Sequence, residues 1–233
     1  MEDKTKTSTC IYHFLVLNWY IFLSYYIPNI GKDEKLLKDF HDGGHSKYLT
    51  LLNLLLQAVF FGVACLDDVL KRIMGRKGIK FITSFRDLLF TTMAFPISVF
   101  VFLVFWALFH YDRERVYPKA LDAFFPAWVN HAMHTSIFPL SLVEAILRPY
   151  HYPSKKLGLT LLTVFNLAYI TRILWIYSQT GNWVYPVFAS LRPLGIFIFF
   201  LVTYILSVSI YLLGERLNRW KWGATMKPWM KVK

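Results

Sequence analysis

Two histidines one helical turn apart are the residues of this chain best suited to chemistry. His131 and His134 belong to the run 130–135, inside the fourth of six long apolar stretches. An ionisable group within a membrane is costly unless the protein satisfies it, so such groups often mark functional sites. A neutral imidazole can act as a general base or bind a metal. The run therefore predicts either a catalytic centre or a metal or haem site.

Helical phase separates the two histidines. At about 100° per residue, Asn130, His134 and Ser141 fall on one stripe of a helix, and His131 lies on its shoulder. The stripe should face the bundle interior, because polar groups facing lipid find no partner. Pro139 cannot donate to the carbonyl of the fourth residue before it, which predicts an irregular helix just beyond His134. No Cys, Asp or Glu clusters with the two histidines, so a metal or haem site would lack further ligands.

A second polar stripe runs along the second apolar stretch and consists of Thr50, Asn53 and Gln57. Thr50 and His134 differ by roughly 6 Å in expected depth, at about 1.5 Å per residue, which helix tilt can remove. A threonine hydroxyl needs a base to take its proton before it can attack a carbonyl. The two stripes thus allow a Thr/His pair that would act on a lipid-soluble ester, which is one of three interpretations. Arg172 could complement a carboxylate or an oxyanion, or else reach to the membrane interface.

A third interpretation requires no chemistry. Thr50, Asn53 and Gln57 would then only cross-link helices, or the stripes would line a lipid-binding cavity in a protein that regulates a partner. The sequence has neither the G-x-S-x-G elbow of soluble hydrolases nor an H-E-x-x-H motif.

The elements that must position these residues are membrane helices. The 233 residues are 56% hydrophobic and only 17% charged, and a soluble domain of this size would not hold six such apolar runs. We expect an all-α, polytopic membrane bundle forming a single domain over 1–233. Its six transmembrane helices are expected at about 10–27, 48–66, 88–109, 128–147, 157–177 and 193–213.

The basic residues predict the orientation. If the six helices cross the membrane in alternating directions, 17 of the 26 Lys and Arg residues fall on the side of the two termini and eight on the other side. Since basic residues are enriched on the cytoplasmic side, this favours both termini in the cytoplasm. The net charge of +12 is therefore expected to reflect topology and attraction to anionic lipid. No nucleic-acid motif accompanies it, and no nucleic-acid partner is expected.

Several polar residues are expected to be structural. Glu144 and Arg148 have the spacing of an ion pair within one helix, and Asp67 and Asp68 resemble a solvated helix end. Cys65 is expected to be a reduced thiol, either buried or palmitoylated at the membrane boundary.

The segments 47–57 and 130–135 resemble the two hallmark segments of the androgen-induced gene 1 family, also called the FAR-17a family. The segments 7–17, 66–72 and 211–218 are close to one member, so the similarity covers essentially the whole chain. The resemblance implies a multipass membrane threonine hydrolase of fatty acid esters of hydroxy fatty acids, with Thr50 as nucleophile and His134 as the paired histidine. The candidate donors to the oxyanion of such a reaction are Asn53, Asn130, His131 and Arg172.

The same resemblance implies a functional link to tissue factor pathway inhibitor (TFPI) and thus to anticoagulant activity. No cofactor is expected. The expected location is the plasma membrane, with internal membranes as the alternative.

Overall fold

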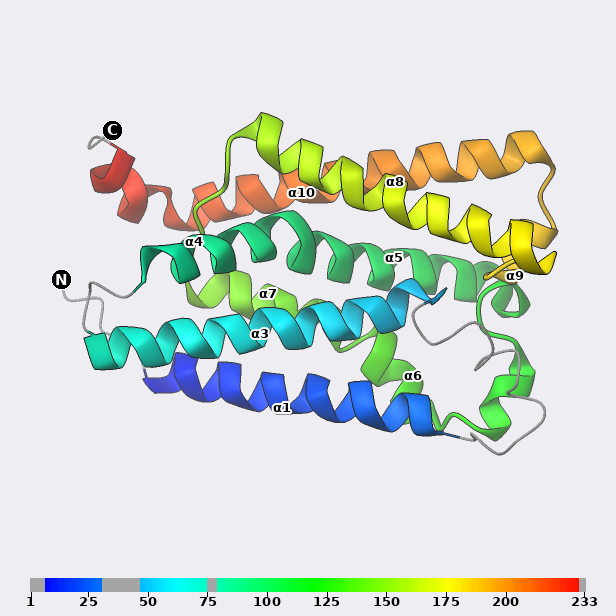
Figure 1. Ribbon diagram of the computed structural model, residues 1–233, viewed down its shortest axis with the longest axis horizontal. Helices are drawn as coiled ribbons and strands as arrows, with labels where there is room; N and C mark the ends of the chain where they lie inside the picture. The colour runs from blue at the N-terminus through cyan, green and yellow to red at the C-terminus, as the bar shows by residue number, and fades with distance from the viewer. Residues whose placement is uncertain (1–6, 31–46, 75–78, 231–233) are drawn as a thin grey trace.

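The apolar stretches form long helices packed side by side (Figure 1). The structure is a computed structural model that describes residues 7–30, 47–74 and 79–230, without the side chains of 225–230. The described residues contain no strand, which confirms the all-α prediction. The longer helices are α1 (Thr7–Asn29), α3 (Leu49–Met74), α4 (Lys80–Leu89), α5 (Phe95–Asp112), α6 (Ala127–His134), α7 (Ile137–Leu147), α8 (Lys155–Thr180) and α10 (Pro193–Met230). The short ones are the π-helical η4 (Phe90–Ala94), the 3₁₀ turns η5 (Arg113–Arg115) and η6 (Lys119–Ala123), and α9 (Pro186–Ala189).

Among the described residues, five helical segments are long and apolar enough to cross a membrane, so the predicted count of six is not confirmed. They are α1, α3, the continuous rod from α4 to the end of η5, α8, and α10 as far as Ala224. Figure 1 shows that α1 starts and α10 ends at the same (left) end of the bundle, where α3 also ends. Thr50 lies at the opposite end, because α3 begins there.

The expected fourth span over 128–147 is two helices rather than one. α6 ends at His134, and the backbone N–H groups of Thr135 and Ser136 both bond back to the carbonyl of His131, at 2.8 and 2.9 Å. Pro139 has no N–H to offer the carbonyl of Thr135, so the helical ladder cannot continue through this point. The irregularity predicted beyond His134 is confirmed, and it makes His134 the last residue of its helix.

A second proline shapes the rod formed by α4, η4 and α5. Pro96 cannot donate a backbone hydrogen bond, and directly before it the N–H of Phe95 bonds to the carbonyl of Phe90, five residues back. The hydroxyls of Thr91 and Thr92 donate to carbonyls one turn earlier, at 2.8 and 2.6 Å. These bonds give the two buried threonine hydroxyls of the π-helical turn hydrogen-bond partners within an apolar interior.

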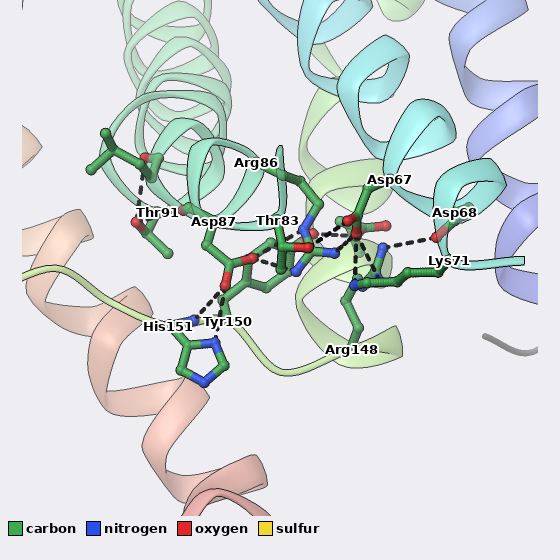
Figure 2. A network of polar contacts seen from close by, with 12 residues as sticks. Asp67, Asp68, Lys71, Thr83, Arg86, Asp87, Thr91, Arg148, Tyr150 and His151 are labelled. Carbon is green, nitrogen blue, oxygen red and sulfur yellow. Dashed lines mark hydrogen bonds and ion pairs between the residues drawn. The ribbon is translucent and has the colours of Figure 1, made fainter. Parts of the chain in front are cut away.

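Ion pairs join the helices at the end of the bundle where α3 ends (Figure 2). The guanidinium of Arg86, only 3% exposed, donates to both Asp67 and Asp87. Asp67 also accepts from Lys71 at 2.9 Å and from Thr83 at 2.6 Å. We call this end, with the residues 67, 68, 71, 83, 86, 87, 144, 148, 150 and 151, the ionic end.

The imidazole of His13 extends the ionic end to α1 and α7. Its Nδ1 lies 2.6 Å from Asp68, and its Nε2 lies 2.9 Å from Glu144. All three side chains are buried, and Glu144 also accepts from the hydroxyl of Tyr150. Two carboxylates on one imidazole favour a proton on both of its nitrogens, so this group holds α1, α3 and α7 together by charge.

Two predictions for these residues were wrong. Arg148 does not pair with Glu144, because its guanidinium reaches Asp68 at 3.3 Å while Glu144 turns to His13. Asp67 and Asp68 do not form a solvated helix end, since they are 1% and 2% exposed. In both cases partners from distant helices replace water or a neighbour in the same helix.

The first prediction concerns the buried guanidinium. Replacing Arg86 by Leu leaves two buried carboxylates without their shared partner, which should destabilise the protein by about 3–5 kcal/mol. Lys71→Met is the matched control, because Lys71 also binds Asp67 but is partly exposed and should cost about 1 kcal/mol or less. Thermal unfolding of the detergent-solubilised variants measures both. Equal losses in the two variants would contradict a central role for Arg86.

The second prediction concerns pH. The hydrogen bond from His151 Nδ1 to Asp87, at 3.0 Å, raises the pKa of His151 above its ordinary value of 6.5. The ion pair should therefore stabilise the fold fully below about pH 6.5 and lose this effect as the pH rises through the raised pKa. His151→Gln should be less stable than the parent at pH 6, and the difference should shrink at higher pH. A difference that grows with pH would have the wrong sign. The effect should be small, since the His151 side chain is 65% exposed.

Candidate active site

The structure brings Thr50 and His134 into contact. Thr50 is the second residue of α3 and His134 the last of α6, and the distance from Thr50 Oγ1 to His134 Nε2 is 3.2 Å. The imidazole is buried, at 5% exposed, and the hydroxyl is half-buried. Two residues 84 positions apart in sequence thus form a hydroxyl–imidazole pair.

Asn130 fixes which nitrogen of His134 carries the proton. Nδ1 lies 3.1 Å from the backbone carbonyl oxygen of Asn130 and 2.7 Å from its side-chain Oδ1. A backbone carbonyl can only accept, so Nδ1 must donate and Nε2 of the neutral ring is left with a free lone pair. The Thr50 hydroxyl then donates to Nε2. This is the arrangement in which a general base takes the proton of a nucleophile.

Stacking holds the imidazole in this orientation. The ring of Phe105, on α5, lies parallel to that of His134, with an interplanar angle of 5° and a centroid distance of 3.5 Å. Phe105 is itself buried, at 6% exposed. The hydrogen bonds to Asn130 and this stack leave the ring little freedom to turn away from Thr50.

Two tyrosines hold the start of α3, where Thr50 lies. The N–H of Leu49, one of the groups that a helix start leaves without a partner, donates to Tyr185 Oη at 3.0 Å. Tyr185 Oη lies 2.9 Å from Tyr169 Oη, and Tyr169 donates to the carbonyl of Lys47 at 3.1 Å. Burial raises the pKa of Tyr185, so this phenol keeps its proton and can donate to Tyr169. The relay ties the first residue of α3 and the residue two positions before it to α8 and to the segment before α9.

An apolar cavity of about 120 Å³ opens beside Thr50. Its walls come from α3, α5, α8, the residues 185–188 and α10, and nearly all of them are hydrocarbon. Among its lining residues are Phe105, Tyr169 and Tyr185, so it adjoins both the imidazole stack and the tyrosine relay. Phe100, Val104, Leu108, Phe165, Ile173, Phe199 and Phe200 supply much of the apolar surface.

The other two candidate residues lie apart from the pair. His131 is exposed, bonds to Thr135 Oγ1 at 3.0 Å and stacks on Trp106, with ring centroids 5.5 Å apart. Arg172 is exposed on α8 and is not among the residues that line the cavity. The two imidazoles therefore face different partners, as the phase argument predicted, and they do not converge on one point.

Sequence reasoning did not assign roles to Phe105, Tyr169 or Tyr185. Asn130 was placed on the stripe of His134, but its part in orienting the ring was not predicted. Its spacing of four from His134 was the available signal, since residues four apart meet on one helix face. No local signal marks the tyrosines, which touch α3 across more than 120 positions.

Comparison with known proteins shows the family of this chain. The model of the FAR-17a/AIG1-like protein family matches residues 8–219. The chain belongs to the FAR-17a/AIG1-like family. It is 78% identical to the rat androgen-dependent TFPI-regulating protein, over 97% of this chain and 99% of the relative, and 63% identical to the human protein of that name, over 98% and 100%. The human androgen-induced gene 1 protein is 42% identical over 77% of this chain and 79% of its own. No solved structure matches the chain.

The third prediction tests the tyrosine relay. Tyr185→Phe removes the acceptor of the Leu49 N–H, and an unsatisfied buried donor costs about 1–3 kcal/mol. Tyr117→Phe is the control, because the buried Tyr117 hydroxyl has no hydrogen-bond partner among the described residues and its loss should not destabilise the protein. Thermal unfolding compares the two, and hydrogen exchange at the start of α3 should rise only in Tyr185→Phe. An equal response in both variants would show that the relay does not hold α3.

Proposed function

We propose that this protein hydrolyses lipid esters, with Thr50 as nucleophile and His134 as general base. The observation that carries the proposal is the Thr50 Oγ1–His134 Nε2 contact of 3.2 Å, with the proton of the imidazole held on the opposite nitrogen by Asn130. A hydroxyl so placed beside an apolar cavity can reach the carbonyl of an ester whose chains occupy that cavity.

The proposed substrates are fatty acid esters of hydroxy fatty acids, the class that the family resemblance implies. The hydrocarbon walls of the cavity suit an acyl chain, and its place among apolar helices suits entry from the lipid phase. Such a substrate would present its ester carbonyl to Thr50 at the edge of the cavity.

In the proposed mechanism, Thr50 Oγ1 attacks the ester carbonyl carbon while its proton passes to His134 Nε2. The carbonyl π electrons move to oxygen, giving a tetrahedral oxyanion. When this intermediate collapses, the C–O bond to the hydroxy fatty acid breaks, and the departing oxygen takes the proton from His134. Water, deprotonated by His134, then attacks the acyl-threonine carbonyl carbon. When this second tetrahedral intermediate collapses, the bond to Thr50 Oγ1 breaks, Oγ1 takes the proton back from His134, and the fatty acid is released. Asn130 accepts from Nδ1 throughout and stabilises the charged imidazolium.

The contrasting proposal is lipid binding without chemistry, in which the same cavity holds an acyl chain. The names of the relatives also support a proposal that this protein takes part in regulating TFPI. Neither proposal needs the Thr50–His134 contact, so replacing these two residues separates them from hydrolysis.

The fourth prediction tests hydrolysis directly. In purified protein, Thr50→Ala removes the nucleophile and should abolish cleavage of a fatty acid ester of a hydroxy fatty acid. Thr50→Ser keeps a hydroxyl and should retain part of the activity. His134→Ala should lower kcat by about 10²–10⁴-fold, the range for loss of a general base. A fluorophosphonate should label the parent protein on Thr50, as peptide mass spectrometry can establish.

His131→Ala is the matched control, because its imidazole is exposed and bonds to Thr135, and it should keep parental activity. Full activity in Thr50→Ala would refute the proposed nucleophile. An inactive parent that still binds the ester would instead support the lipid-binding proposal.

A further inference from the structure

Asn53 is a buried amide whose donor end has no partner. Its side chain is 1% exposed, and its Nδ2 is among the buried polar atoms without a hydrogen bond in the described part of the chain. Leaving such a group unpaired costs about 1–3 kcal/mol, so an unpaired amide in a native core calls for an explanation.

A backbone carbonyl fixes the orientation of this amide. Gln57 Nε2 donates to the carbonyl of Ala94 at 3.0 Å, and since that oxygen can only accept, Nε2 and Oε1 of Gln57 cannot be exchanged. The same Nε2 donates to Asn53 Oδ1 at 3.0 Å, so the end of Asn53 that faces Gln57 must be its oxygen. Nδ2 is therefore the end without a partner.

The contacts at Oδ1 also strengthen Nδ2 as a donor. Ser98 Oγ is a second donor to Asn53 Oδ1, at a longer distance of 3.5 Å. Donors at the carbonyl end of an amide polarise it, which makes its N–H groups better donors in a low-dielectric interior.

Asn53 lies beside the proposed nucleophile. It follows Thr50 by three residues on α3, so the two side chains share one helix face about 4.5 Å apart along the axis. Its oxygen is engaged by Gln57, one turn further from Thr50, and by Ser98 of α5. The cavity is bounded on this side by Thr50 and by Pro96 and Ile97, which directly precede Ser98.

We propose that Asn53 Nδ2 donates a hydrogen bond to the ester carbonyl oxygen and to the oxyanion that forms when Thr50 attacks. This inference rests on the proposed hydrolysis. The oxyanion is two covalent bonds from Thr50 Oγ1, so its donor must come from a neighbour of Thr50. A buried, oriented amide with no partner before the substrate arrives fits that requirement, because its hydrogen bond is gained as negative charge develops on oxygen.

The fifth prediction is that Asn53→Leu, which has a similar volume but no donor, lowers kcat by about 10²–10³-fold, the usual cost of one lost oxyanion donor. KM should change far less. Fluorophosphonate labelling of Thr50 should slow in parallel, since the phosphoryl oxygen needs the same donor. Asn53→Asp keeps an oxygen for Gln57 and Ser98 but loses the donor, and it should be equally impaired. It also serves as the second variant if the leucine variant does not fold.

Ser141→Ala is the matched control, because the Ser141 hydroxyl is another buried polar group without a hydrogen-bond partner in the described segments and lies on α7, outside the site. It should leave kcat and labelling unchanged. If the parent is active and Thr50→Ala is not, but folded Asn53→Leu or Asn53→Asp keeps its kcat, the role of Asn53 is refuted while the proposed hydrolysis stands. A parent without esterase activity would overturn both.

Discussion

The rest of this structure depends on the cost of an unpaired polar group among apolar helices. In a bundle surrounded by lipid, water cannot satisfy such groups, so each must find its partner inside the protein. At the ionic end the requirement is met by charge: His13 bridges Asp68 and Glu144, and Arg86 bridges Asp67 and Asp87. Removing one partner would leave a buried charge, which is why these contacts fix how the helices pack.

The same requirement organises the candidate active site by neutral hydrogen bonds. Asn130 binds one nitrogen of His134, and Thr50 binds the other. Tyr185 binds the first N–H of α3, and Tyr169 binds the carbonyl of Lys47 just before the helix. Among the described residues, the Nδ2 of Asn53 and the Oε1 of Gln57 are buried without a hydrogen-bond partner, and Nδ2 is the donor of the two and the nearer to Thr50 in sequence. A substrate oxygen would accept a hydrogen bond from this Nδ2. The unpaired amide thus lowers the stability of the free protein at the place where the proposed reaction needs a donor.

Two prolines give the bundle the irregular backbone that this site needs. Pro139 lies just after the break at 135–136, which leaves His134 at the end of α6 rather than in the middle of a span. Pro96 follows the π-helical turn η4, and Ala94 in that turn accepts from Gln57. In each case a missing backbone donor loosens the helix next to a polar side chain of the site.

The sequence by itself determined the helical class, the apolar stretches and the two polar stripes, because these follow from hydrophobic length and helical period. It also separated His134 from His131 and brought Thr50 to a comparable depth. It could not determine the partners of Glu144, Arg148, Asp67 and Asp68, for which the local readings were wrong. Their actual partners lie on other helices, and local spacing carries no information about which helices become neighbours.

Only the tertiary structure decided that His134 Nδ1 is the protonated nitrogen, that Tyr185 holds the start of α3, and that the amide of Asn53 has a free donor. Each of these depends on hydrogen bonds about 3 Å long, and such a bond is fixed by packing rather than by periodicity. The helical period predicts which face of a helix a residue lies on. Which atom donates a proton to which acceptor can be determined only from the positions of both atoms.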